Sequence, residues 1–202
     1  MRAILLHGYN VSRPEDNVGE LIPTLKNYGI EPVLLNYGEL NLIDLRPRNN
    51  TVARLLKEIA KPGDILITHS NGAAIAYEAA MKYDLAELKA LIMFNPALNT
   101  EFVFPNATSD KIVVMHNKTD APVLVSKLWR TITKISPLSI NYGGHLWGAA
   151  GRDGFKRRER YTAHIDMSQG ENAVKGHSAQ FRPPEVADYW MRKALEAAGL
   201  GN

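Results

Sequence analysis

The sequence predicts an α/β fold, a three-layer α/β/α sandwich around a mostly parallel six-stranded sheet. Short apolar runs alternate along the chain with longer segments in which apolar residues recur every three or four positions. The short runs contain few polar residues, as expected of parallel strands that are buried on both faces. A length of 202 residues suits one domain, so residues 1–202 are expected to form a single unit.

The order of predicted elements follows from these patterns and from turn residues between them. Gly29 and the pair Pro62-Gly63 each follow a helical pattern and mark its end. The predicted strands are Arg2–Leu6, Pro32–Leu35, Ile65–Thr68, Leu88–Phe94, Lys111–Met115 and Arg160–Ile165. The predicted helices are Glu15–Tyr28, Asn49–Ile59, Gly72–Tyr83, about Val123–Ile135 and Pro184–Ala198. Residues 137–159 lack a period and are rich in glycine and basic residues, which predicts an irregular insertion.

Composition excludes several classes of function. The chain has no cysteine, which excludes disulfides, thiolate catalysis and cysteine-based zinc sites. A net charge of +3 is too small to indicate a nucleic-acid partner. The basic run Lys156–Arg160 is expected to be solvated surface, with contact to an anionic partner as the alternative. The first apolar run ends at Leu6, too short for a signal peptide or a membrane span, so a cytoplasmic protein is expected.

The most informative stretch is the junction between a predicted strand and an alanine-rich helix, Ile65 to Ala74. Ser70 lies at this junction, and Gly72 two residues later permits a close backbone approach. A serine there would project its hydroxyl at the carboxyl end of the strand, beside the N–H groups that begin the helix. The alternative is that Ser70 serves only as a helix N-cap.

This junction resembles the nucleophile elbow of the α/β-hydrolase superfamily, Gly-x-Ser-x-Gly, with Thr68 in place of the first glycine. The superfamily places an acid and then a histidine after later strands. Asp120 follows the strand ending near Met115, and His177 lies in Lys175-Gly176-His177-Ser178 before the last helix. By this resemblance Ser70, Asp120 and His177 form a catalytic triad. Asp166 is the competing carboxylate, although it lies on the wrong side of the order.

The turn His7-Gly8-Tyr9-Asn10 resembles the superfamily's His-Gly turn after its first strand. The resemblance implies that the backbone N–H groups of Tyr9 and Asn71 form the oxyanion hole. It covers nearly the whole chain and implies a small, lidless, esterase- or lipase-like member. The segment 95–110, where many relatives insert a lid domain, is short.

Other aromatic and histidine residues have two interpretations each. His7, His69 and Trp147 are candidates for the substrate pocket, or they support the loops structurally. His145 and His164 with Asp166 could be imagined as metal ligands, but no motif of metal-binding spacing supports this. We therefore expect neither a metal nor a cofactor.

The expected function is that of a serine hydrolase that cleaves carboxylic esters or related acyl bonds through an acyl-enzyme on Ser70. Its expected partner is a small-molecule ester or other acyl substrate. One alternative is a non-catalytic binding module that keeps the hydrolase fold. Another is an acyltransferase that uses the same three residues.

Overall fold

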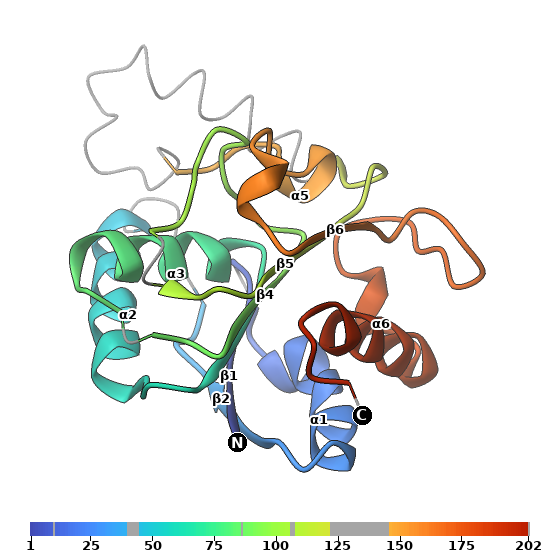
Figure 1. The fold of residues 1–202 in the computed structure, drawn as a ribbon, viewed down its shortest axis with the longest axis horizontal. Helices are drawn as coiled ribbons and strands as arrows, with labels where there is room; N and C mark the ends of the chain where they lie inside the picture. Colours follow the sequence, from blue (N-terminus) through green and yellow to red (C-terminus); the bar gives the residue numbers. More distant parts are fainter. Residues whose placement is uncertain (10, 40–44, 86, 106–107, 122–145, 202) are drawn as a thin grey trace.

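A six-stranded sheet organises the chain (Figure 1). The computed structural model describes residues 1–9, 11–39, 45–85, 87–105, 108–121 and 146–201. The strands lie in the order β2-β1-β3-β4-β5-β6, and all five pairings are parallel. Their bounds are β1 Arg2–Leu6, β2 Glu31–Leu35, β3 Ile65–His69, β4 Ala90–Phe94, β5 Ile112–His116 and β6 Ala163–Asp166. Each predicted strand is therefore present, with its ends shifted by a few residues.

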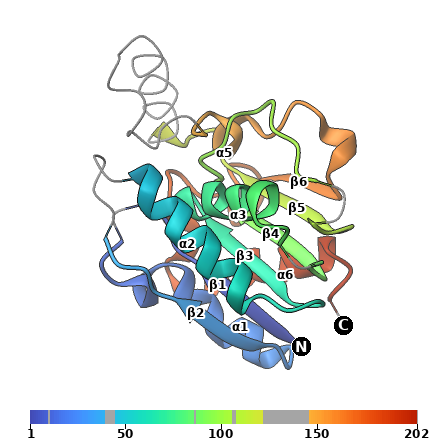
Figure 2. The ribbon, with the colours of Figure 1, turned by 90° about the vertical axis from the view of Figure 1, so that its left-hand side faces the viewer.

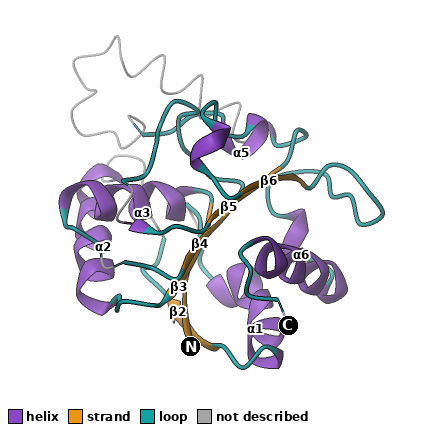
Figure 3. Ribbon diagram, viewed as in Figure 1, coloured by secondary structure: helices purple, strands orange, loops and turns teal. Residues whose placement is uncertain are grey.

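Helices cover both faces of this sheet, which confirms the predicted three-layer sandwich (Figure 3). α2 (Leu45–Ile59) and α3 (Asn71–Lys82) pack side by side on one face (Figure 2). α1 (Ile22–Asn27) and α6 (Pro184–Ala197) lie on the other face. A short helix, α5 (Ala150–Asp153), lies against β5. No helix in the described ranges has the length and apolar character needed to cross a membrane.

Alternation along the strands explains how one sheet supplies two cores. In β1, Ile4 and Leu6 join the core beneath α2 and α3, whereas Ala3 and Leu5 join the core beneath α1 and α6. Successive side chains of a strand point to opposite faces, so a buried parallel strand must be apolar at every position. This is why the central strands are continuous apolar runs in the sequence.

The first predicted helix, Glu15–Tyr28, is only partly correct. Two 3-10 turns, Pro14–Asp16 and Val18–Leu21, precede α1, which begins only at Ile22. Asn17 between the turns has φ −134° and ψ −110°, which is not helical. Pro23 lacks an N–H group and is therefore tolerated only in the first turn of a helix, which is where it lies in α1.

Two other boundaries differ from expectation. α2 begins at Leu45 rather than at Asn49, and Pro47 lies in its first turn, where its missing N–H costs nothing. The insertion at 137–159 is not wholly irregular, because it contains α5 and runs into a 3-10 turn at Arg158–Arg160. The predicted helix at about 123–135 and the insertion residues 137–145 lie outside the described residues.

Candidate active site

Ser70 occupies a sharp turn between β3 and α3. Its backbone angles are φ 52° and ψ −117°, a strained conformation for a residue with a side chain. Backbone hydrogen bonds hold the turn: the Ser70 N–H donates to the Phe94 carbonyl at 3.0 Å, and the Ser70 carbonyl accepts from the N–H groups of Ala73 and Ala97. Strain that persists under such support is characteristic of functional sites.

Gly72 allows α3 to pack directly on β1. A Cβ atom at this position would lie 2.7 Å from the Leu6 carbonyl oxygen and 2.8 Å from that of His7. Thr68, which stands where the superfamily pattern has its first glycine, is fully buried in β3. The turn therefore requires Gly72, whereas the sheet accommodates the threonine side chain.

Asp120 and His177 are brought together by the ends of two distant segments. The His177 Nδ1 lies 2.7 Å from the Asp120 Oδ2, and Asp120 is fully buried. A carboxylate accepts, so Nδ1 carries the proton and Nε2 keeps its lone pair. Asp166, the competing carboxylate, instead accepts from Ser168 and pairs with Lys118 at 3.0 Å. Asp120 is thus the carboxylate that contacts the imidazole.

The loop that carries His177 is fastened to the loop that carries Asp120. The Asn117 side-chain amide donates to the carbonyls of Val174 and Gly176, at 3.1 Å and 3.0 Å. The Gly176 N–H in turn donates to the Thr119 hydroxyl at 3.0 Å. Sequence reasoning missed Asn117 and Thr119, because both look like ordinary turn residues after a strand.

His69 brings His177 next to the elbow. The His69 Nε2–H donates to the His177 carbonyl at 3.0 Å, and the two ring centroids are 4.7 Å apart. His69 directly precedes Ser70 and is almost completely buried. Burial, reinforced by the neighbouring His177 charge, holds the pKa of His69 well below its ordinary value. His69 is therefore neutral at physiological pH and acts as a hydrogen-bond donor.

The two predicted oxyanion donors lie beside the elbow. A Cβ on Gly8 would lie 3.1 Å from the Ser70 Cβ, so the turn that contains Tyr9 is adjacent to the serine. Asn71 is the first residue of α3, and N–H groups at a helix start have no intrahelical partner. The Asn71 side chain is buried and exchanges two hydrogen bonds with Asn49 of α2, at 2.9 Å and 3.1 Å.

The remaining pocket candidates pack around these turns. The indole N–H of Trp147 donates to the Asn71 Oδ1 at 2.9 Å, and its ring meets Tyr9 edge to face. His7 stacks on Tyr37 with ring centroids 3.8 Å apart and donates from Nδ1 to the Gly8 carbonyl. Burial lowers the pKa of His7. The three candidates for the substrate pocket, His7, His69 and Trp147, therefore all contact the loops of the site, and the rings of His7 and His69 are buried.

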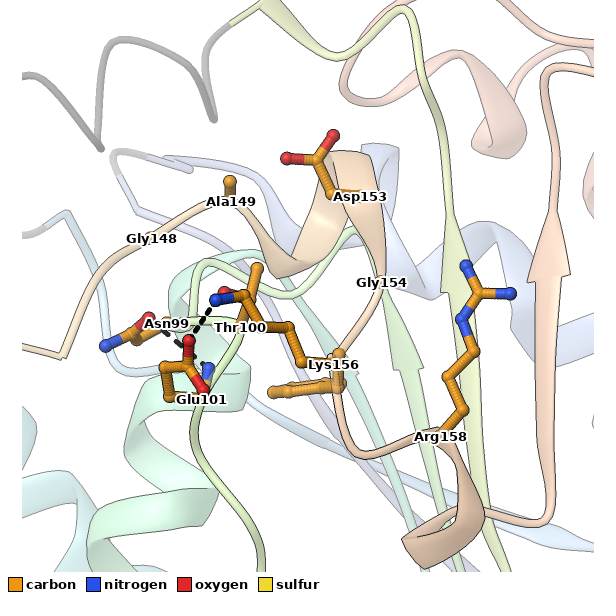
Figure 4. A pocket seen from close by; sticks show the side chains of 10 residues that line it. Asn99, Thr100, Glu101, Gly148, Ala149, Asp153, Gly154, Lys156 and Arg158 are labelled. Carbon is orange, nitrogen blue, oxygen red and sulfur yellow. Dashed lines mark hydrogen bonds and ion pairs between the residues drawn. The ribbon is translucent and has the colours of Figure 1, made fainter.

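A cavity of about 490 Å³ lies on the loop after β4 and on α5 (Figure 4). An ion pair between Lys156 and Glu101 spans part of its wall. The same loop contains Ala97, whose N–H binds the Ser70 carbonyl. The cavity is lined by Asn99, Thr100, Glu101, Gly148, Ala149, Asp153, Gly154, Phe155, Lys156 and Arg158.

His164 of β6 is half-buried, its two ring nitrogen atoms are shielded from solvent, and it contacts none of the three residues Ser70, Asp120 and His177 in the contacts described above. Neither ring nitrogen has a hydrogen-bond partner among the described residues. Burial, together with the charges of Arg158 and His116, lowers the pKa of His164 from 6.5 to about 4. No group of three or more potential metal ligands occurs within the described ranges, and His145 lies outside them.

The depressed pKa of His164 predicts a loss of stability in acid. The unfolded chain binds a proton on His164 below about pH 6.5, whereas the folded chain resists it until about pH 4. Stability is therefore full above pH 6.5 and falls by up to about 3 kcal/mol as the pH drops to 4. Urea unfolding at pH 7, 5.5 and 4.5 should show a smaller loss in His164→Gln than in the wild type. Parallel curves would contradict this assignment.

Comparison with known proteins identifies the fold. No family model matches the chain, and no curated protein matches it. The ydeN gene product of Bacillus subtilis has a similar structure, with a TM-score of 0.60, 14% identity, and coverage of 96% of this chain and 98% of that one. A YdeN-like protein from Pectobacterium atrosepticum gives a TM-score of 0.56 at 13% identity, covering 100% and 92%. An esterase from Pyrococcus furiosus gives 0.53 at 14% identity, covering 96% and 80%.

Proposed function

We propose that this chain, which has the α/β-hydrolase fold, is a serine hydrolase with Ser70 as nucleophile, His177 as base and Asp120 as the orienting acid. One observation carries the proposal. A buried carboxylate fixes the Nδ1 of His177 at 2.7 Å, and the imidazole lies against the residue preceding a strained serine. Serine is a weak nucleophile, so a strained serine beside an oriented base is the arrangement that nucleophilic catalysis needs.

The reaction proceeds in two half-reactions. The Ser70 Oγ attacks the acyl carbonyl carbon as its proton passes to the His177 Nε2, and Asp120 stabilises the imidazolium. The backbone N–H groups of Tyr9 and Asn71 bind the oxyanion. The intermediate collapses, the imidazolium protonates the departing alcohol, and an acyl-enzyme remains on Ser70. Water, deprotonated by His177, then attacks the acyl carbonyl carbon. The bond from that carbon to the Ser70 Oγ breaks, the imidazolium returns the proton to Oγ, and the carboxylic acid leaves.

A carboxylic ester is the substrate class that this proposal favours. An alcohol is a better leaving group than an amine, so an ester makes a smaller demand on the base than an amide does. The structural likeness to the Pyrococcus furiosus esterase agrees with this choice. These steps use side chains and backbone N–H groups of this chain, together with one water molecule from the solvent.

The test is intact-mass analysis after incubation with a fluorophosphonate, which phosphonylates only an activated serine. Wild type should gain the mass of one adduct, and folded Ser70→Ala and His177→Ala should gain none. Circular dichroism confirms that the variants are folded. An unmodified, well-folded wild type would reject the proposal and favour a binding module with the same fold. An adduct that persists in Ser70→Ala would place the nucleophile elsewhere.

A further inference from the structure

The backbone carbonyl of His177 accepts hydrogen bonds from three side chains. It accepts from the Asn95 Nδ2 at 2.7 Å, from the His69 Nε2 at 3.0 Å and from the Gln180 Nε2 at 3.2 Å. A carbonyl oxygen has two lone pairs, so three donors exceed what satisfying it requires. The donors come from three separate segments, namely the ends of β3 and β4 and the 3-10 turn Ala179–Phe181. Such convergence fixes the position of the main chain at the proposed base.

Asn95 makes the shortest of these bonds from an unfavourable position. It lies just after β4 with φ 44°, in the left-handed region that a residue with a side chain rarely adopts. It is fully buried, and its Oδ1 has no partner among the described residues. A strained backbone and an unsatisfied buried oxygen both cost stability, which points to a functional reason for the residue.

Neighbouring backbone holds Asn95 in this conformation. Its N–H donates to the Met115 carbonyl at 2.7 Å, which continues the pairing of β4 with β5. Gly151 of α5 packs so closely that a Cβ there would lie 2.6 Å from the Asn95 carbonyl carbon. The backbone of Asn95 is therefore held in place, and its side-chain amide is directed at the His177 carbonyl.

We propose that Asn95 is a positioning residue for His177, acting through the His177 backbone carbonyl. This inference rests on the proposed function of His177 as base. Asp120 anchors one end of the residue at Nδ1, and Asn95 anchors the other end at the carbonyl oxygen. Two anchors leave the imidazole a single orientation toward Ser70. Since small displacements of a catalytic group are costly, loss of the second anchor slows the chemical step.

The decisive variant is Asn95→Gly, because glycine adopts φ 44° without strain and removes the side-chain amide that donates to the His177 carbonyl. Its kcat for an activated ester is expected to fall roughly 10- to 100-fold with KM nearly unchanged. Asn17→Gly is the matched control, since Asn17 is also a buried asparagine whose Oδ1 has no partner among the described residues. The control should keep the wild-type kcat. Wild-type kcat in folded Asn95→Gly would overturn the inference.

A second readout separates this inference from the proposed function. The His177 imidazole resonances, followed by NMR, should broaden and shift in Asn95→Gly but not in Asn17→Gly, whether or not the protein hydrolyses esters. A wild type without a fluorophosphonate adduct rejects the hydrolase, and unchanged His177 resonances reject the positioning by Asn95. Asn95→Asp, which keeps the shape and replaces the donor with an oxygen, serves if the glycine variant fails to fold. It should perturb the same resonances and lower kcat at least as much.

Discussion

The Asp120→Asn variant is expected to lose roughly 10⁴-fold in kcat for an activated ester, with KM close to that of the wild type. An asparagine at this position can donate its amide N–H to the His177 Nδ1. The imidazole then carries its proton on Nε2, where the mechanism needs a lone pair. A neutral amide also fails to stabilise the imidazolium. Steady-state kinetics on purified, folded protein measure the effect.

Asp166→Asn is the matched control, because it makes the same change at the carboxylate that ends β6. Asp166 binds Ser168 and Lys118 rather than His177, so kcat should change only a few-fold. A large loss in Asp166→Asn together with a small one in Asp120→Asn would exchange the roles of the two residues. Equal small losses would reject a carboxylate-assisted base altogether.

The Gly72→Ala variant is expected to be the most damaging single methyl group that can be added to the elbow. The new Cβ would meet the carbonyl oxygens of Leu6 and His7 at 2.7 Å and 2.8 Å, and backbone cannot rotate away as a side chain can. We expect a loss of about 3 kcal/mol in the free energy of unfolding, at the upper end of overpacking effects. Guanidinium unfolding followed by circular dichroism measures it.

Gly29→Ala is the control variant, because it adds a methyl group at a glycine where the new Cβ would contact no other atom. Nothing lies within 4 Å of the corresponding Cβ, but φ is +66°, so about 1 kcal/mol of backbone strain is expected. Gly72→Ala should exceed this cost and should also lower fluorophosphonate labelling, because any shift of α3 moves Ser70. A Gly72→Ala protein as stable as Gly29→Ala would show that α3 can withdraw from β1 at little cost.

The sheet could be predicted from the sequence because its strands are buried on both faces. A run such as Ala3-Ile4-Leu5-Leu6 feeds two cores, so its apolar character is continuous and easy to recognise. The structure of the segment before α1 could not be predicted in the same way. Its apolar spacing is helical, but the non-helical Asn17 separates two 3-10 turns, and Pro23 is compatible only with a helix that begins beside it, at Ile22. Spacing reports which residues face the core, and it does not report whether the backbone between them is continuous.

The residues of the proposed triad could be found because each follows a strand and belongs to a resembled motif. Their supports could not. The amide of Asn95 and the imidazole of His69 act on a backbone carbonyl 82 and 108 positions away along the chain. The acceptor in both bonds is a backbone carbonyl, which every residue has, so nothing in the sequence indicates that His177 is the residue that Asn95 and His69 bind. The sharp turn at Ser70 could be predicted, because it requires Gly72.

The strand order also has a consequence for synthesis on the ribosome. Most of the backbone that forms the elbow, from β1 and β3 to Gly72 and α3, lies within the first 82 residues of the chain, and the two further residues that bond to Ser70, Phe94 and Ala97, follow in the next segment. His177 is translated about a hundred residues later and reaches the elbow only after β4, β5 and β6 have been added at one side. A nascent or truncated chain that has completed the elbow therefore carries an unactivated serine. On the proposed mechanism, Ser70 becomes reactive only after the segment that carries His177 has been synthesised and has folded onto the sheet.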